Sequence, residues 1–112
     1  MKLSAEAIDG ALVVRLGEPR LDAAIAIQFK DRMREMLAHP SPRVVLDMAA
    51  VGFLDSSGLG ALVAVMKGLM PARQLELRGL SANVERVFRL TRMDSVFTIS
   101  ADAPRDGLRD VG

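Results

Sequence analysis

Apolar residues recur along the chain with two different spacings, and each spacing predicts a different kind of element. Residues 3–8 and 11–16 are short strand-like runs on either side of Asp9-Gly10, a dipeptide favoured in tight hairpin turns. Residues 43–48 have a β-branched, apolar centre, which is typical of a strand covered on both faces. Further strands are expected at residues 74–78 and 96–99. The pattern thus predicts an N-terminal antiparallel hairpin followed by three more strands.

Three stretches between these strands place apolar residues three and four positions apart, which is the spacing of one helix face. Asp22 is positioned to cap the first helix and Ser81 to cap the third. The predicted apolar faces are Ile25, Ala26, Phe29, Met33, Met36 and Leu37 in the first helix, Leu59, Leu62, Val63, Met66 and Leu69 in the second, and Val84, Val87, Phe88 and Thr91 in the third. We also consider a short helix over residues 103–111.

The predicted order of elements is β-β-α-β-α-β-α-β. Such alternation implies an α/β fold, in which a mixed, mostly parallel sheet begins with the hairpin and has helices packed on it. A chain of 112 residues is long enough to bury one core and too short for two. We therefore expect a single domain over residues 1–112, without repeats or linkers.

Composition and charge exclude several classes of function. The formal net charge is +1, and Lys and Arg are scattered rather than clustered with aromatic residues, so nucleic-acid binding is not expected. The chain has no cysteine, which excludes disulfides, thiolate catalysis and sulfur-ligated metals. No apolar run approaches the roughly 18 residues of a membrane-spanning helix, and no signal segment is evident. These features predict a cytoplasmic protein.

The most informative motif is Phe-Leu-Asp-Ser-Ser-Gly-Leu-Gly at residues 53–60, between a predicted strand and the second helix. It places Asp55, Ser56 and Ser57 where the helix should begin, at the sheet rim where α/β domains carry functional groups. A Ser or Asp there accepts hydrogen bonds from free backbone N–H groups, and the helix dipole favours an anion. The alternative interpretation is that these residues only cap the helix.

Other kinds of chemical site find little support in the sequence. His39 is the only histidine and has no second metal ligand. Asp47 and Asp55 lack the acidic neighbour and downstream lysine of a magnesium-dependent phospho-acceptor. The two glycines of the motif lack the lysine of a phosphate-binding loop, and Ser56 lacks the preceding glycine of a hydrolase nucleophile elbow. We therefore predict no catalytic residue, no metal and no cofactor.

The order of elements, the Val-Val-Leu-Asp run at residues 44–47 and the motif at residues 53–60 together resemble the STAS domain, and specifically the bacterial anti-sigma factor antagonists. The resemblance covers nearly the whole chain, because residues 74–99 also look like that family's closing strand, helix and strand. It implies a protein that has no catalytic activity of its own and acts by partner switching.

In the family that this chain resembles, the serine after the aspartate is phosphorylated by the anti-sigma factor, which is itself an ATP-dependent serine/threonine kinase. That serine corresponds to Ser56. The unphosphorylated antagonist binds the anti-sigma factor and frees the sigma factor, until phosphorylation ends the binding and a metal-dependent serine phosphatase restores the hydroxyl. The resemblance implies partner-binding residues Asp22, Asp55, Ser56, Ser57 and Gly58. We assign Asp55 to shaping the loop and contacting the partner, and Ser57 to capping the helix.

One segment departs from the family pattern. Residues 17–22 read Gly-Glu-Pro-Arg-Leu-Asp, where the antagonists commonly have a Gly-Glu-Leu-Asp-like turn. The two inserted residues leave Asp22 as the matching aspartate, and Pro19 and Arg20 are expected to reshape this part of the binding surface. The alternative function is a non-switching STAS subunit of a transport or signalling complex. The hydroxyl of Ser56 favours the switch, because a purely structural subunit has no need of it.

Overall fold

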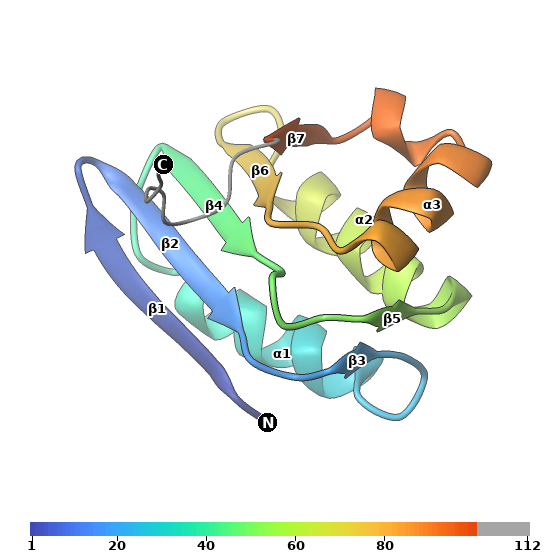
Figure 1. Cartoon of the computed structure of the whole chain (residues 1–112). Helices are drawn as coiled ribbons and strands as arrows, with labels where there is room; N and C mark the ends of the chain where they lie inside the picture. The colour runs from blue at the N-terminus through green and yellow to red at the C-terminus, as the bar shows by residue number, and fades with distance from the viewer. Residues whose placement is uncertain (101–112) are drawn as a thin grey trace, which may run out of the picture.

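The computed structural model describes residues 1–100, and its main feature is a five-stranded sheet with the order β1-β2-β4-β6-β7 (Figure 1). The strands are β1 (Leu3–Ile8), β2 (Ala11–Leu16), β4 (Arg43–Asp47), β6 (Gln74–Arg78) and β7 (Thr98–Ser100). β1 pairs antiparallel with β2 through Asp9 and Gly10, whose positive φ angles suit a tight hairpin turn. All other neighbours are parallel. The predicted mixed sheet with its N-terminal hairpin is confirmed.

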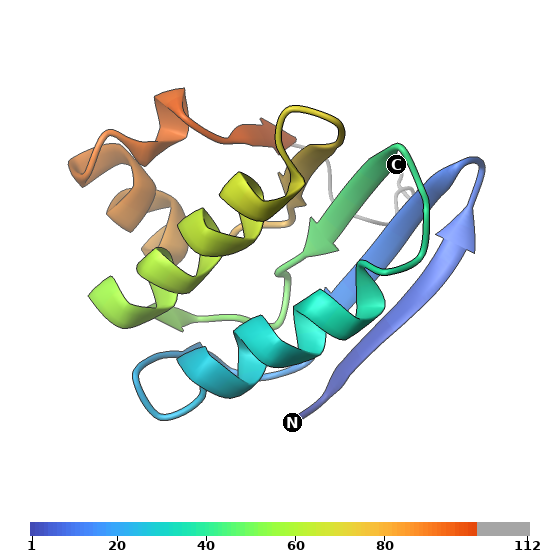
Figure 2. The same cartoon turned by 180° about the vertical axis from the view of Figure 1, so that it is seen from behind.

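Three helices connect these strands, namely α1 (Ala26–Met36), α2 (Ser56–Leu69) and α3 (Ala82–Leu90), and a short 3-10 helix η1 (Met93–Ser95) precedes β7. Figure 2 shows α1 and α2 lying side by side across one face of the sheet. Their apolar faces join the inward side chains of the strands in one core. Its fully buried members include Val14, Phe29, Met33, Val44, Leu46, Leu62, Leu77 and Phe88. Removal of this apolar surface from water is the main stabilising term of the fold.

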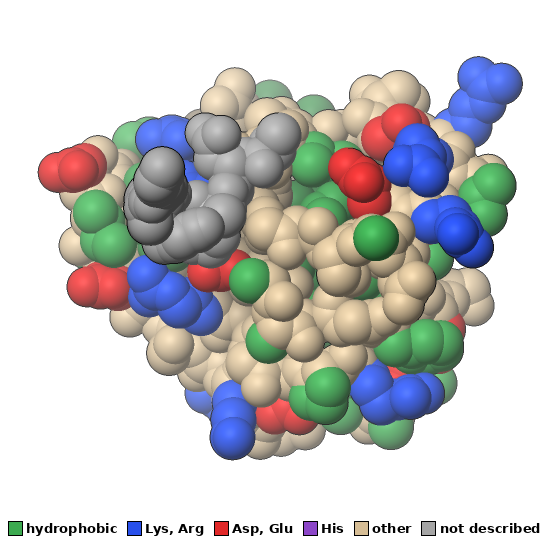
Figure 3. Space-filling view, in the orientation of Figure 1, with side chains coloured by type: hydrophobic (Ala, Val, Ile, Leu, Met, Phe, Trp, Pro, Cys, Tyr) green, Lys and Arg blue, Asp and Glu red, His purple; other side chains and the backbone are tan. Residues whose placement is uncertain are grey.

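The opposite face of the sheet carries ion pairs. Successive side chains of a strand point to opposite faces, so the residues between the core positions lie together on this side. Arg15 pairs with Glu6 at 3.2 Å and with Asp47 at 3.7 Å, and Arg43 pairs with Glu76 at 3.0 Å. Figure 3 shows the mixture of acidic and basic side chains on this face. The Arg15–Glu6 pair is exposed and adds only about 0–1 kcal/mol, whereas the side chains of Asp47 and Glu76 are only 10% and 16% exposed.

A second, two-stranded parallel sheet was not predicted from the sequence. It pairs β3 (Arg20–Leu21) with β5 (Phe53–Leu54), in the register Arg20 to Phe53 and Leu21 to Leu54. On the sequence pattern, these residues fall in the connections before the first and second helices. Two-residue strands are too short to show a periodicity, and they form here because the long-range partner is present. This small sheet holds the start of α2 beside the loop that precedes α1.

Two predicted element starts are wrong. The N-cap of α1 is Ile25 rather than Asp22, because the chain first makes a turn in which the Asp22 carbonyl accepts from the N–H groups of Ile25 and Ala26. The last strand begins at Thr98 rather than residue 96, because η1 extends the connection. Ser81 does cap α3, since its hydroxyl oxygen accepts from Val84 N–H. The helix considered at residues 103–111 lies outside the described residues.

Candidate functional site

The second helix begins with two exposed serines. α2 starts at Ser56, as the sequence predicts, and both Ser56 and Ser57 are exposed. Within residues 1–100, neither hydroxyl makes a hydrogen bond. Both hydroxyls therefore face solvent at the N-terminal end of a 14-residue helix, and a partner protein can reach them.

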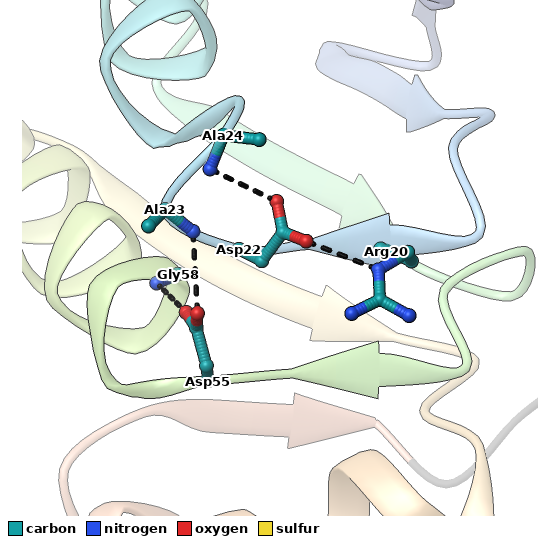
Figure 4. Close-up of polar contacts among 6 residues, drawn as sticks. All are labelled: Arg20, Asp22, Ala23, Ala24, Asp55 and Gly58. Atoms are coloured by element: carbon teal, nitrogen blue, oxygen red, sulfur yellow. Dashed lines mark hydrogen bonds and ion pairs between the residues drawn. The ribbon is translucent and has the colours of Figure 1, made fainter.

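Asp55 is the residue that caps this helix, so the prediction that Ser57 provides the cap is wrong. The Asp55 carboxylate accepts from Gly58 N–H at 2.8 Å, which satisfies one of the free N–H groups of the first turn. Its other oxygen accepts from Ala23 N–H at 3.2 Å, across the gap to the loop before α1 (Figure 4). One carboxylate therefore ties together two segments that are 32 residues apart in the sequence. The prediction that Asp55 shapes this loop is consistent with both contacts.

Asp22 lies on the neighbouring loop and is held by Arg20. Its carboxylate accepts from Ala24 N–H at 3.1 Å and from the Arg20 side chain at 3.0 Å (Figure 4). The Arg20 guanidinium also lies 4.3 Å from the ring centre of Phe53, which is 41% exposed. Arg20 therefore joins Asp22 to an aromatic ring in this part of the rim. No pattern in the sequence points to the contact with Phe53, because this contact depends on the pairing of β3 with β5.

Gly58 is buried, and it is the position where α2 packs against β3. A Cβ built on Gly58 would lie 2.1 Å from the Leu21 carbonyl oxygen and 2.8 Å from a Leu54 methyl carbon. Only a residue without a side chain fits between the helix and this backbone. Gly58 therefore positions Ser56 and Ser57 and has little exposed surface of its own.

Replacing Asp55 with alanine is expected to lower the free energy of unfolding by about 1–2 kcal/mol, because the cap of α2 and the bond to Ala23 are both lost. Asp55→Asn should lower the free energy of unfolding by less than Asp55→Ala, because the side-chain oxygen of asparagine can still cap a helix. Urea unfolding followed by circular dichroism measures both variants. Equal stability of Asp55→Ala and the unaltered protein would contradict the assigned cap.

The other acidic residue near a strand end belongs to a different cluster. Asp47 is buried, accepts from Ala49 N–H at 3.0 Å and faces Arg15, so its oxygens engage none of the groups that hold Asp55. Among residues 1–100, no three His, Cys, Asp or Glu side chains come together as a metal-binding group. No helix in this part of the chain is long and apolar enough to cross a membrane.

These residues define a small α/β domain with an exposed polar rim at the start of its second helix. The family model for the STAS domain matches residues 2–104, and the chain belongs to this family. A relative from Bordetella bronchiseptica, named "Putative anti-sigma factor antagonist BtrV", is 30% identical over 101 residues, which cover 89% of this chain and 86% of the relative. The chain is thus a member of the anti-sigma factor antagonists within the STAS family.

Solved structures agree with this assignment. An anti-sigma factor antagonist from Mycobacterium paratuberculosis superimposes with a TM-score of 0.79 at 26% identity, over 94% of this chain and 86% of the other. The Bacillus cell fate determinant SpoIIAA, in its phosphorylated form, superimposes with a TM-score of 0.63 at 19% identity, over 89% of this chain and 92% of the other. The second likeness concerns the fold alone.

Proposed function

We propose that this protein is the phosphorylatable switch of a partner-switching pathway. Its unphosphorylated form binds an anti-sigma factor that is also a serine/threonine kinase, and this binding frees a sigma factor. Phosphorylation of Ser56 ends the binding, and a metal-dependent serine phosphatase restores it. The protein itself contributes no catalysis, and it acts in the cytoplasm. Ser56 is the modified residue, and Asp22, Asp55 and Ser57 contribute to the docking rim.

The observation that carries the proposal is the exposed, unbonded hydroxyl of Ser56 at the first position of α2. A kinase must place a serine oxygen in line with a γ-phosphate, which requires a hydroxyl that no neighbour holds. The fold is also shared with SpoIIAA, a protein whose structure is known in a phosphorylated form.

The contacts of Asp55 suggest how a phosphate acts here. The Asp55 carboxylate already accepts a hydrogen bond from Gly58 N–H, so a phosphate on Ser56 would lie beside a negative charge. A phosphoserine adds about 1.5 to 2 negative charges and three acceptor oxygens. The rim then carries a bulky, strongly anionic group where the partner docks, and a loss of about 2–3 kcal/mol in binding is enough for a switch of roughly 30- to 150-fold. No refolding of the domain is required.

Phosphorylation by the partner kinase tests this proposal. The protein is incubated with ATP and the anti-sigma kinase that it binds, identified by pull-down, and intact mass and peptide fragmentation locate the phosphate. We expect one added phosphate on Ser56, none in Ser56→Ala, and normal uptake in the matched variant Ser57→Ala. Normal uptake by Ser56→Ala would show that the modified residue is another one.

The alternative function, a non-switching STAS subunit of a larger complex, predicts no phosphate uptake in the same assay. It also predicts that Ser56→Ala leaves binding and release of every partner unchanged. The exposed hydroxyl favours the switch, and no contact within residues 1–100 favours the alternative.

A further inference from the structure

A cavity lies between the C-terminal halves of α1 and α2, on the helical side of the molecule seen in Figure 2. Its volume is ≈ 270 Å³. Small-molecule sites typically measure about 300–1,000 Å³, so this cavity suits a small ligand. Its apolar wall is formed by Leu37 of α1 and by Val65 and Leu69 of α2. No aromatic and no acidic side chain lines it.

The rim of this cavity is cationic. Lys30, Arg34 and Arg73 line it. Arg73 is fixed in place, because its guanidinium donates at 2.7 to 2.8 Å to three backbone carbonyls that follow or end α1, those of Leu37, His39 and Ser41. Arg34 has a single weak partner, Asp31 at 3.4 Å. Lys30 is half-buried, and it makes no hydrogen bond or ion pair with any residue in the range 1–100.

The lining selects the chemistry of a ligand. Lys30 is a half-buried residue without a counter-ion beside apolar walls, so an anion is favoured here, and a carboxylate between Lys30 and Arg34 would neutralise its charge. The lining side chains offer no acceptor for hydroxyl or amide groups and no ring for stacking, which disfavours sugars and nucleobases. We propose that this cavity binds a free aliphatic carboxylic acid of medium chain length. The alkyl chain lies against Leu37, Val65 and Leu69.

This site is separate from the serine rim. Ser56 begins α2, whereas the residues of α2 that line the cavity start at Ala64. Eight residues of helix correspond to about 12 Å along the axis. Ligand binding here does not rest on the proposed phosphorylation, so the two proposals can fail independently.

Decanoate, below its critical micelle concentration, is the probe for this site. Isothermal titration calorimetry of the unphosphorylated protein should give saturable binding of decanoate. Decanol, which lacks the carboxylate, and acetate, which lacks the alkyl chain, should each bind at least about tenfold more weakly. Amide NMR shifts should map decanoate to the C-terminal halves of α1 and α2. Binding of decanol as tight as that of decanoate, or no saturable binding of decanoate, would overturn the proposal.

Variants locate the ligand within the cavity. The double variant Lys30→Glu/Arg34→Glu should reduce decanoate affinity at least about tenfold, while Lys67→Glu, on an exposed lysine of α2 outside the lining, should not. The leucine side chain of Gly68→Leu should fill the cavity. The fold should tolerate this substitution, because a Cβ at position 68 meets no atom within 4 Å. Gly60→Leu is its matched control, since that position on α2 is equally open but lies outside the lining. Full decanoate affinity in Gly68→Leu would place the ligand elsewhere.

Discussion

Replacing Gly58 with alanine is expected to destabilise the protein by about 3 kcal/mol or more, because the added methyl group would collide with the backbone of β3. The Leu21 carbonyl that it meets belongs to a strand and cannot turn aside as the end of a flexible side chain could. Either α2 must move outward or the β3–β5 pairing must break. Both changes also displace Ser56 and Asp55, so the variant is expected to lose partner binding together with stability.

Gly60→Ala is the matched control for this prediction. Gly60 lies on the same helix, and nothing lies within 4 Å of a Cβ placed there. Alanine is favoured over glycine in a helix by about 0.8–1 kcal/mol, so Gly60→Ala should stabilise the protein slightly. Urea unfolding of both variants should give a lower free energy of unfolding for Gly58→Ala and a slightly higher one for Gly60→Ala. Similar stabilities of Gly58→Ala and Gly60→Ala would contradict the close packing of α2 on β3.

Ser56→Glu is expected to weaken binding to the anti-sigma kinase by about tenfold or more, because it places a permanent charge on the docking rim. The fold should be retained, since Glu in the first turn of a helix interacts favourably with the helix dipole. Ser56→Gln has nearly the same size without the charge, and it should bind much more tightly than Ser56→Glu. Titration calorimetry with the kinase gives both affinities. If Gln weakens binding as much as Glu, size rather than charge determines the effect.

The main sheet and the position of the serine motif could be predicted because both follow from local patterns. The hairpin is indicated by Asp9-Gly10 between two apolar runs, and the start of α2 by the polar residues at 55–57 before a helical repeat. Contacts between distant segments could not be predicted in the same way. The cap of α2 by Asp55 is a local bond to Gly58 N–H, but the bond from Ala23 N–H to the other carboxylate oxygen comes from 32 residues away and leaves no local pattern.

The need for glycine at position 58 and the stacking of Arg20 on Phe53 have the same origin. Each requires β3 beside β5, and neither two-residue strand has a signature of its own. The sequence indicated that Pro19 and Arg20 would alter this part of the rim. It could not indicate that Arg20 would bridge Asp22 and an aromatic ring.

Release of the sigma factor is the measurement that tests the proposed switch most directly. The anti-sigma kinase is first bound to its fluorescently labelled sigma factor, and free sigma factor is then followed by anisotropy as this protein is added. We predict that the unphosphorylated protein displaces the sigma factor and that the same protein phosphorylated on Ser56 does not. Equal displacement by the two forms, or displacement by neither, would contradict the account.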